Sequence, residues 1–212
     1  MTHTAAPSPT FARFLGQLRA TGREKLDGFD RSHFAGLTAS ERDDARRLLA
    51  EATRSGDAIA ALGLELLDGP GAVPVLRAAL PSAYTAHNTA RAMVLGALWR
   101  LTHDPTYRDA LAALAAQTDG PDAIVRQTAL VELENADYSP AFMSALWKAV
   151  RDPSSETVRY LAVGQLLRAA GLIADVHQEH YPHMDIVRDV VEGDAERREG
   201  AVRRLAQLVD AA

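Results

Sequence analysis

The chain has 212 residues, no cysteine and a formal net charge of −5, and 47% of its residues are hydrophobic while 24% are charged. The absence of cysteine excludes a disulfide framework, a thiolate zinc site and a cysteine nucleophile, and the composition is typical of a folded domain rather than a disordered chain. Residues 57–152 carry 7 basic and 11 acidic side chains, which argues against a surface that neutralises nucleic-acid phosphates.

The N-terminal segment, residues 1–37, is expected to form capping helices that stand outside the regular pattern that follows. It holds four of the five phenylalanines, namely Phe11, Phe14, Phe29 and Phe34. We interpret these side chains as a plug over the open end of a helical stack, because the end units of such a stack must be atypical. An exposed aromatic patch for a partner is the alternative.

Targeting segments are not recognisable in the sequence. The first residues lack the charged start and apolar core of a secretory signal, and no run approaches the roughly 18 apolar residues of a membrane span. We therefore expect a cytoplasmic protein.

From residue 38 onward the sequence predicts helices and no strands. Apolar residues recur three and four positions apart, and Thr38 and Glu41 have the spacing of a capping box. Breaks rich in Gly, Pro and Asp separate the helical segments. The expected helices cover residues 39–54, 57–68, 71–80, 87–101, 105–117, 121–135, 140–151, 155–170, 182–191 and 194–210.

The second helix of each predicted hairpin carries the same pattern. Arg91, Arg126, Arg159 and Arg198 follow one another at spacings of 35, 33 and 39 residues. Small or apolar residues stand three positions further on, at Val94, Ala129, Ala162 and Ala201, and leucines seven positions further on, at Leu98, Leu133, Leu166 and Leu205. In the first helices, Leu76, Leu111 and Leu146 lie 35 apart. Such a period indicates an all-α solenoid of about four to five hairpins over residues 38–212, in a single domain with the cap.

Two segments resemble the HEAT-repeat signature, an Asp-Pro turn followed by a Val-Arg pair. The segment from Asp152 to Arg159 reads DPSSETVR, and the segment from Asp119 to Arg126 reads DGPDAIVR. The resemblance covers about residues 57–210. In that family the Asp and Arg side chains stack between repeats, so the resemblance implies that these four residues form a structural ladder and not a catalytic site.

Three of the helices present a candidate partner-binding surface. When Arg91, Arg126 and Arg159 are placed at the same helical angle, the positions one and eight residues further on share one direction. They give a stripe of aromatic, polar and acidic residues: Trp99, Gln127, Glu134 and Tyr160. This mixed character is typical of protein recognition, while packing of both aromatic residues between helices is the alternative. The opposite side, with Arg100 and Arg168, is expected to be a solvated face.

The densest polar cluster is DVHQEHYPHMD at residues 175–185. Histidine is a common metal ligand, so the metal candidates are His177, His180 and His183. We prefer a solvated loop between two helices, and we expect no metal and no cofactor. A metal-dependent or bilin-lyase-like HEAT enzyme that uses this loop is the alternative function.

The sequence favours a non-enzymatic protein-binding solenoid, either a scaffold or adaptor or an inhibitor that occludes another protein. In size, charge and repeats the chain is similar to bacterial immunity proteins that occlude a toxin. The expected partner is a neutral or basic protein. A second alternative is nucleic-acid binding through the C-terminal Arg197, Arg198, Arg203 and Arg204, although interleaved acidic residues are typical of a charge-paired helix.

Overall fold

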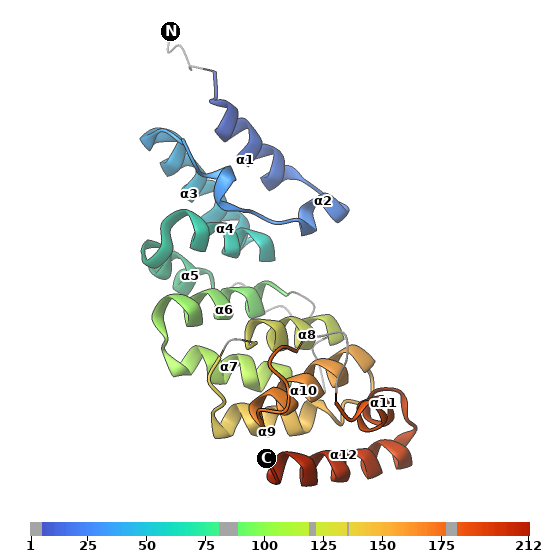
Figure 1. The fold of residues 1–212 in the computed structure, drawn as a ribbon. Helices are drawn as coiled ribbons and strands as arrows, with labels where there is room; N and C mark the ends of the chain where they lie inside the picture. Colours follow the sequence, from blue (N-terminus) through green and yellow to red (C-terminus); the bar gives the residue numbers. More distant parts are fainter. Residues whose placement is uncertain (1–5, 81–88, 119–121, 135, 177–181) are drawn as a thin grey trace. The chain divides into compact units, whose positions relative to one another are not determined.

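The computed structural model describes residues 6–80, 89–118, 122–134, 136–176 and 182–212. Within these residues the chain forms helices joined by turns and loops, and no β-strand is present among them (Figure 1). The all-α class that the sequence predicts is therefore confirmed.

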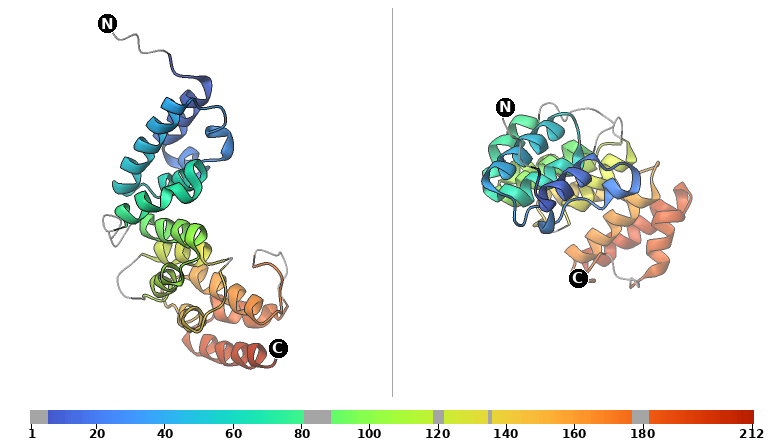
Figure 2. Two further views of the ribbon diagram at one scale, coloured as in Figure 1. Left: turned by 90° about the vertical axis from the view of Figure 1, so that its left-hand side faces the viewer. Right: turned by 90° about the horizontal axis from the view of Figure 1, so that it is seen from above.

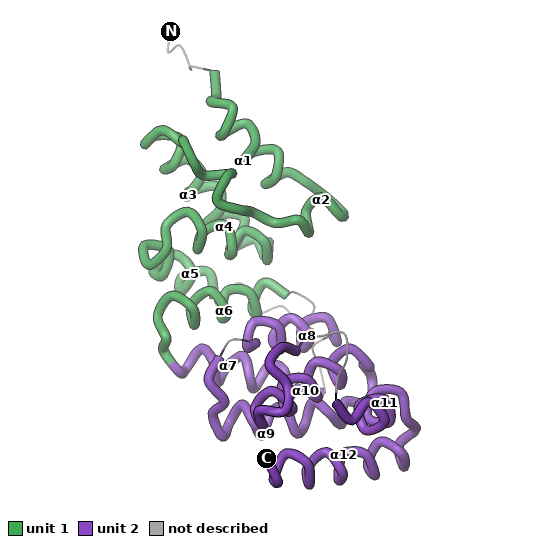
Figure 3. The backbone as a smooth tube through the Cα atoms, in the orientation of Figure 1, with its two compact units in different colours: residues 1–104 green, residues 105–212 purple. Residues whose placement is uncertain are grey.

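The chain divides into two compact units, residues 1–104 and residues 105–212 (Figure 3). Unit 1 contains α1 (Pro9–Arg19), α2 (Gly22–Leu26), the 3₁₀ turn η1 (Arg31–His33), α3 (Ala39–Arg54), α4 (Ala58–Asp68), the 3₁₀ turn η2 (Gly69–Ala72), α5 (Val73–Ala79) and α6 (Ala90–Thr102). Unit 2 contains α7 (Pro105–Ala115), α8 (Ala123–Glu132), α9 (Pro140–Ala149), α10 (Glu156–Ala169), α11 (Met184–Glu192) and α12 (Ala195–Asp210). The expected cap, residues 1–37, lies within unit 1.

Helix starts follow capping signals in the sequence. The ends of the helices from α3 onward differ from the predicted ones by at most three residues. The side chains that accept backbone N–H groups at the starts of α4, α9, α10 and α12 are Asp57, Ser139, Ser155 and Asp194. Each satisfies a donor that the first turn of a helix leaves without a partner.

Helices within each unit contact one another in two ways. Sequential helices pair as hairpins: α3 contacts α4, α7 contacts α8, and α11 contacts α12. Helices two apart also touch, so that α3 contacts α5, α4 contacts α6, α7 contacts α9, and α8 contacts α10. Figure 2 shows the last pair of helices, α11 and α12, side by side in unit 2.

The recurring apolar positions form the cores of both units. The leucines Leu76, Leu98, Leu111, Leu133, Leu146, Leu166 and Leu205 are all 0% exposed. The small or apolar residues of the same repeat, Val94, Ala129, Ala162 and Ala201, are also 0% exposed. Alanine lets neighbouring helices approach closely. Each fully buried leucine stabilises the fold by roughly 1.5–3 kcal/mol relative to an exposed one.

One described helical stretch, Ala58–Ala79, is long and apolar enough to cross a membrane by length and composition, with a mean hydropathy of 1.4. It consists of α4, η2 and α5, and the chain turns at Gly69, where φ is 52°. Because α4 contacts both α3 and α6, its apolar residues are accounted for by the core of unit 1.

The phenylalanines of the N-terminal segment pack against one another. The ring of Phe14 lies 5.7 Å from those of Phe11 and Phe29 and 5.9 Å from that of Phe34. Phe14, Phe29 and Phe34 are buried, and Phe11 is half-buried. These three buried rings leave no exposed patch at their positions, so they are core residues of unit 1.

Glu41 joins the start of α1 to the start of α3. One carboxylate oxygen accepts the backbone N–H of Ser8 at 2.8 Å, and the other accepts that of Thr38 at 3.0 Å. The predicted capping box of Thr38 and Glu41 is present. The backbone hydrogen bonds from Thr38 and then Ser8 lower the pKa of Glu41 to about 2.

Replacement of Phe14 by Ala is expected to lower the free energy of unfolding of the chain by about 3–5 kcal/mol, because the change leaves a cavity in a closed aromatic cluster. Urea denaturation followed by circular dichroism measures the effect. Leu26→Ala is the control, since Leu26 is 77% exposed in the same segment and little should change. Equal effects of the two substitutions would contradict the role of the cluster as a core.

The pH dependence of stability should carry a contribution from Glu41. Its pKa in the folded chain is below the ordinary value of 4.5, so the contribution is complete above that value and is lost as the pH falls toward about 2. The free energy of unfolding of the wild type should therefore fall more between pH 6 and pH 3 than that of Glu41→Gln. Parallel pH profiles for the two proteins would contradict the assignment.

Candidate partner-binding surface

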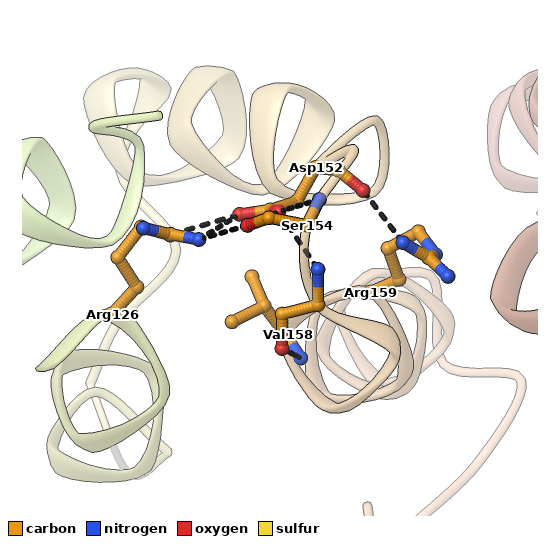
Figure 4. A network of polar contacts seen from close by, with 6 residues as sticks. Arg126, Asp152, Ser154, Val158 and Arg159 are labelled. Atoms are coloured by element: carbon orange, nitrogen blue, oxygen red, sulfur yellow. Dashed lines mark hydrogen bonds and ion pairs between the residues drawn. The ribbon is translucent and has the colours of Figure 1, made fainter. Parts of the chain in front are cut away.

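A buried ion pair joins α8 to the turn between α9 and α10 in unit 2. The Nε of Arg126 donates to Oδ2 of Asp152 at 2.8 Å, and its Nη2 donates to the hydroxyl of Ser154 at 2.7 Å (Figure 4). Oδ1 of Asp152 accepts the N–H and hydroxyl of Ser154 and the N–H of Ser155, at 2.8, 2.7 and 3.1 Å. The Arg126 and Asp152 side chains are only 3% and 1% exposed.

The same position in α10 also links two hairpins. Arg159 donates from Nη1 to the carbonyl oxygen of Asp152 at 2.7 Å and from Nε to that of Val191 at 3.0 Å. Val191 lies near the end of α11, in the following hairpin. Arg198 holds the equivalent place in α12 and donates to the carbonyl oxygen of Gly193 at 2.9 Å. Arg126, Asp152 and Arg159 are thus brought together, and Asp119 lies outside the described residues.

The hydrogen-bonding groups of Asp152 are saturated, and the Asp152, Arg126 and Arg159 side chains are buried, whereas Ser154 is exposed. Burial acts to raise the pKa of Asp152, but the hydrogen bonds from Ser154 and the charge of Arg126 outweigh it and leave the pKa lowered. Burial also lowers the pKa of Arg159. The hydroxyl of the exposed Ser154 already donates to Asp152 and accepts from Arg126, so its hydrogen bonds serve the contact between α8 and this turn.

Arg100, near the end of α6, binds α4, and Arg168, near the end of α10, binds the turn after α8. Arg100 donates from Nε and Nη2 to the carboxylate of Glu65 on α4, at 2.9 and 2.7 Å. Arg168 donates to the carbonyl oxygen of Glu134. The two arginines hold equivalent positions, because Arg100 and Arg168 each follow a repeat arginine, Arg91 or Arg159, by nine residues. Arg100 is exposed and Arg168 is half-buried, so this side faces solvent at Arg100, while neighbouring segments supply acceptors to both arginines.

The four predicted partner-binding residues are divided between the two units, with Trp99 in unit 1 and the other three in unit 2. Trp99 is only 9% exposed and its ring meets that of His103 edge-on at 5.5 Å, so it matches the alternative of a packed side chain. Gln127 and Glu134 belong to α8 and the turn after it, and Tyr160 to α10; all three are half-buried. Since α8 contacts α10, these three share one region of unit 2.

An exposed apolar face of α8 lies in the same region and was not predicted. Ile124 is 52% exposed and Val131 is 44% exposed. Branched apolar residues at helical spacing ordinarily indicate a core, so the pattern of the sequence did not predict this exposure. Their position next to Gln127 makes α8 the centre of the candidate surface.

Other candidate chemistry finds little support among the residues that the structure describes. His177 and His180 lie outside them, and His183 is the exposed residue before α11, with φ of 60°. No group of three or more His, Asp and Glu side chains within the described ranges is placed to hold a metal ion. A groove of about 710 Å³ beside α1 and α3 is lined in part by Phe11 and Glu41. The carboxylate of Glu41 is already engaged there, because it accepts backbone N–H groups at the starts of both helices.

The C-terminal arginines are engaged with acidic and backbone groups. Arg197 and Arg204 donate to the two carboxylate oxygens of Asp189, at 2.5 and 2.8 Å, and Arg198 binds Gly193. The hydrogen bonds from Arg197 and Arg204 lower the pKa of Asp189. This pairing is what the interleaved charges of the sequence indicate, and it reduces the positive charge that α12 can offer to a phosphate backbone.

Replacement of Asp152 by Ala is expected to destabilise the chain by about 3–5 kcal/mol, because Arg126 would stay buried without its counter-ion. The pKa of Asp152 is lowered in the folded chain. Its contribution to the free energy of unfolding is therefore present when the pH is above the ordinary pKa of the group, and it is lost as the pH falls through the lowered pKa. Thermal and urea unfolding at pH 7 measure the change. Glu199→Gln is the control: it breaks an exposed pair with Arg151, at 3.2 Å, and should change little. A small loss in Asp152→Ala would contradict the role of the buried pair.

Comparison of the chain with protein-family models, with curated proteins and with solved structures gives no match. Conclusions about function therefore rest on the geometry and charge of the chain itself.

Proposed function

We propose that the chain is a non-enzymatic protein-binding α-solenoid of HEAT-like repeats, located in the cytoplasm. The observation that carries the proposal is the recurrence of one polar arrangement along unit 2. Arg126 and Arg159, 33 residues apart, each bind the end of the first helix, or the turn after it, in the following hairpin. Repeat proteins use such contacts to stack hairpins, and the stack presents an extended surface to other macromolecules.

The electrostatics of the chain support a protein partner that is neutral or basic. The overall charge is −5 and residues 57–152 carry an excess of four acidic side chains. An acidic surface attracts a basic partner and speeds its encounter. Two roles fit this description: a scaffold or adaptor that holds a partner, and an immunity-type inhibitor that occludes it.

Affinity capture from a bacterial lysate, followed by purification of the captured protein, tests the proposal. We expect a stoichiometric complex by calorimetry, with an affinity reduced about tenfold or more in Glu134→Lys/Tyr160→Ala. Glu196→Lys on α12 is the control for the added charge. The absence of any saturable complex with the purified captured protein would contradict a binding function.

A growth assay separates the two roles. If the captured protein stops growth when expressed alone and co-expression of this chain restores growth, the chain is an immunity-type inhibitor. A captured protein that is harmless when expressed alone indicates a scaffold or adaptor.

A further inference from the structure

Helix α8 exposes two large apolar side chains, Ile124 and Val131, that packing within unit 2 leaves partly uncovered. Ile124 and Val131 are seven residues apart, so they lie within about 20° of one another around the helix. Thr128 lies between them on the same side. Exposure of 52% at Ile124 and 44% at Val131 leaves an apolar ridge two turns long in contact with solvent.

This ridge can be covered without loss of hydrogen bonds. The hydroxyl of Thr128 donates to the carbonyl oxygen of Ile124 at 2.8 Å, so it keeps its partner when water is removed. Ile and Val bring no polar side-chain atoms. Covering polar groups that lose their hydrogen-bond partners is one of the costs of forming an interface, and that cost is small at these three residues.

The corresponding positions of the neighbouring repeats are packed differently. The residue equivalent to Val131 is Gly96 in α6 and Gly164 in α10, and both glycines are buried. Val131 therefore has a larger side chain than the two equivalent glycines and is more exposed to solvent than they are. Branched residues are also weaker helix formers than Ala or Leu, so neither helix stability nor internal packing explains Ile124 and Val131 here.

Acidic side chains of this segment stand at both ends of the ridge, and Arg168 of α10 also reaches the C-terminal end, where it donates to the carbonyl oxygen of Glu134. Asp122 precedes the first residue of α8 and is exposed, and Glu132, Glu134 and Asp137 follow at its C-terminal end. The cation of this segment, Arg126, is buried against Asp152. A ligand laid along α8 thus meets apolar side chains in the middle and carboxylates at the ends.

We propose that the α8 face, formed by Ile124, Gln127, Thr128 and Val131, is the docking site for an amphipathic helix of the partner protein. The partner helix carries an apolar stripe flanked by Lys or Arg. Its apolar ridge packs beside that of α8, as helices do when side-chain ridges enter grooves. The basic flanks face the acidic ends of α8, and the half-buried amide of Gln127 is the polar group at the border. This inference rests on the proposed binding function and specifies its partner.

The probe for the first test is a synthetic helical peptide of about 18 residues, five turns long, with Leu along one face and Lys elsewhere. A second peptide of the same design has Glu in place of Lys. We expect the Lys peptide to bind the full chain by calorimetry, and to shift the ¹H–¹⁵N NMR signals of α8 most. In Ile124→Ser/Val131→Ser the affinity should fall at least about tenfold.

Two controls make the result specific. Met184→Ser removes an apolar side chain that is also 44% exposed in unit 2, and binding of the Lys peptide should be retained. The Glu peptide should not bind. Circular dichroism should show both serine variants folded, because the replaced side chains are exposed and serine has a helix propensity similar to that of Ile and Val.

Several outcomes would overturn the inference. Equal binding of the Lys peptide to wild type and the double serine variant would show attraction by charge alone. Concentration-dependent dimerisation of the wild type that is lost in the double variant would identify a second copy as the occupant. If the captured partner binds the double variant with wild-type affinity, this docking site is wrong while the binding function stands. Failure to capture any partner contradicts the binding function itself.

Discussion

The buried ion pair between Arg126 and Asp152 fixes how one hairpin of unit 2 lies on the next. Removing two charges from water is costly, so such a pair persists only where hydrogen bonds satisfy its remaining donors and acceptors. Asp152 meets this condition because one oxygen serves Arg126 while the other serves the turn that starts α10. The same carboxylate thereby sets the local turn and the contact between hairpins, and any shift of α8 against that turn leaves a charge unpaired.

Much of this arrangement could be predicted from the spacing of the recurring Leu and Arg residues in the sequence. Leu133 and Leu166 are fully buried at equivalent positions, and the pairing of Arg126 with Asp152 involves two residues of the predicted ladder. The acceptors of Arg159 and Arg168 were not predictable in the same way, since both are backbone carbonyl oxygens that any residue supplies. A helical wheel describes one helix at a time, and the neighbouring helix decides which side is covered.

Exposure was the least predictable property for the same reason. Trp99 has the chemistry of a partner anchor, but it is packed, whereas Ile124 and Val131 have the chemistry of a core and are exposed. Burial depends on which helices lie beside a residue, and residue type alone does not contain that information. The candidate binding surface is therefore centred on α8 and differs from the stripe that the sequence predicts. Gln127 belongs to both.

A double-mutant cycle on Arg126 and Asp152 tests the central claim, that this pair couples the hairpins, most directly. The free energies of unfolding of Arg126→Leu, Asp152→Leu and the double variant are compared with that of the wild type. We expect the double variant to be markedly less destabilised than the sum of the single variants, because each single change leaves one buried charge unpaired. Additivity within about 0.3–0.5 kcal/mol, as for independent sites, would show that the pair does not couple them.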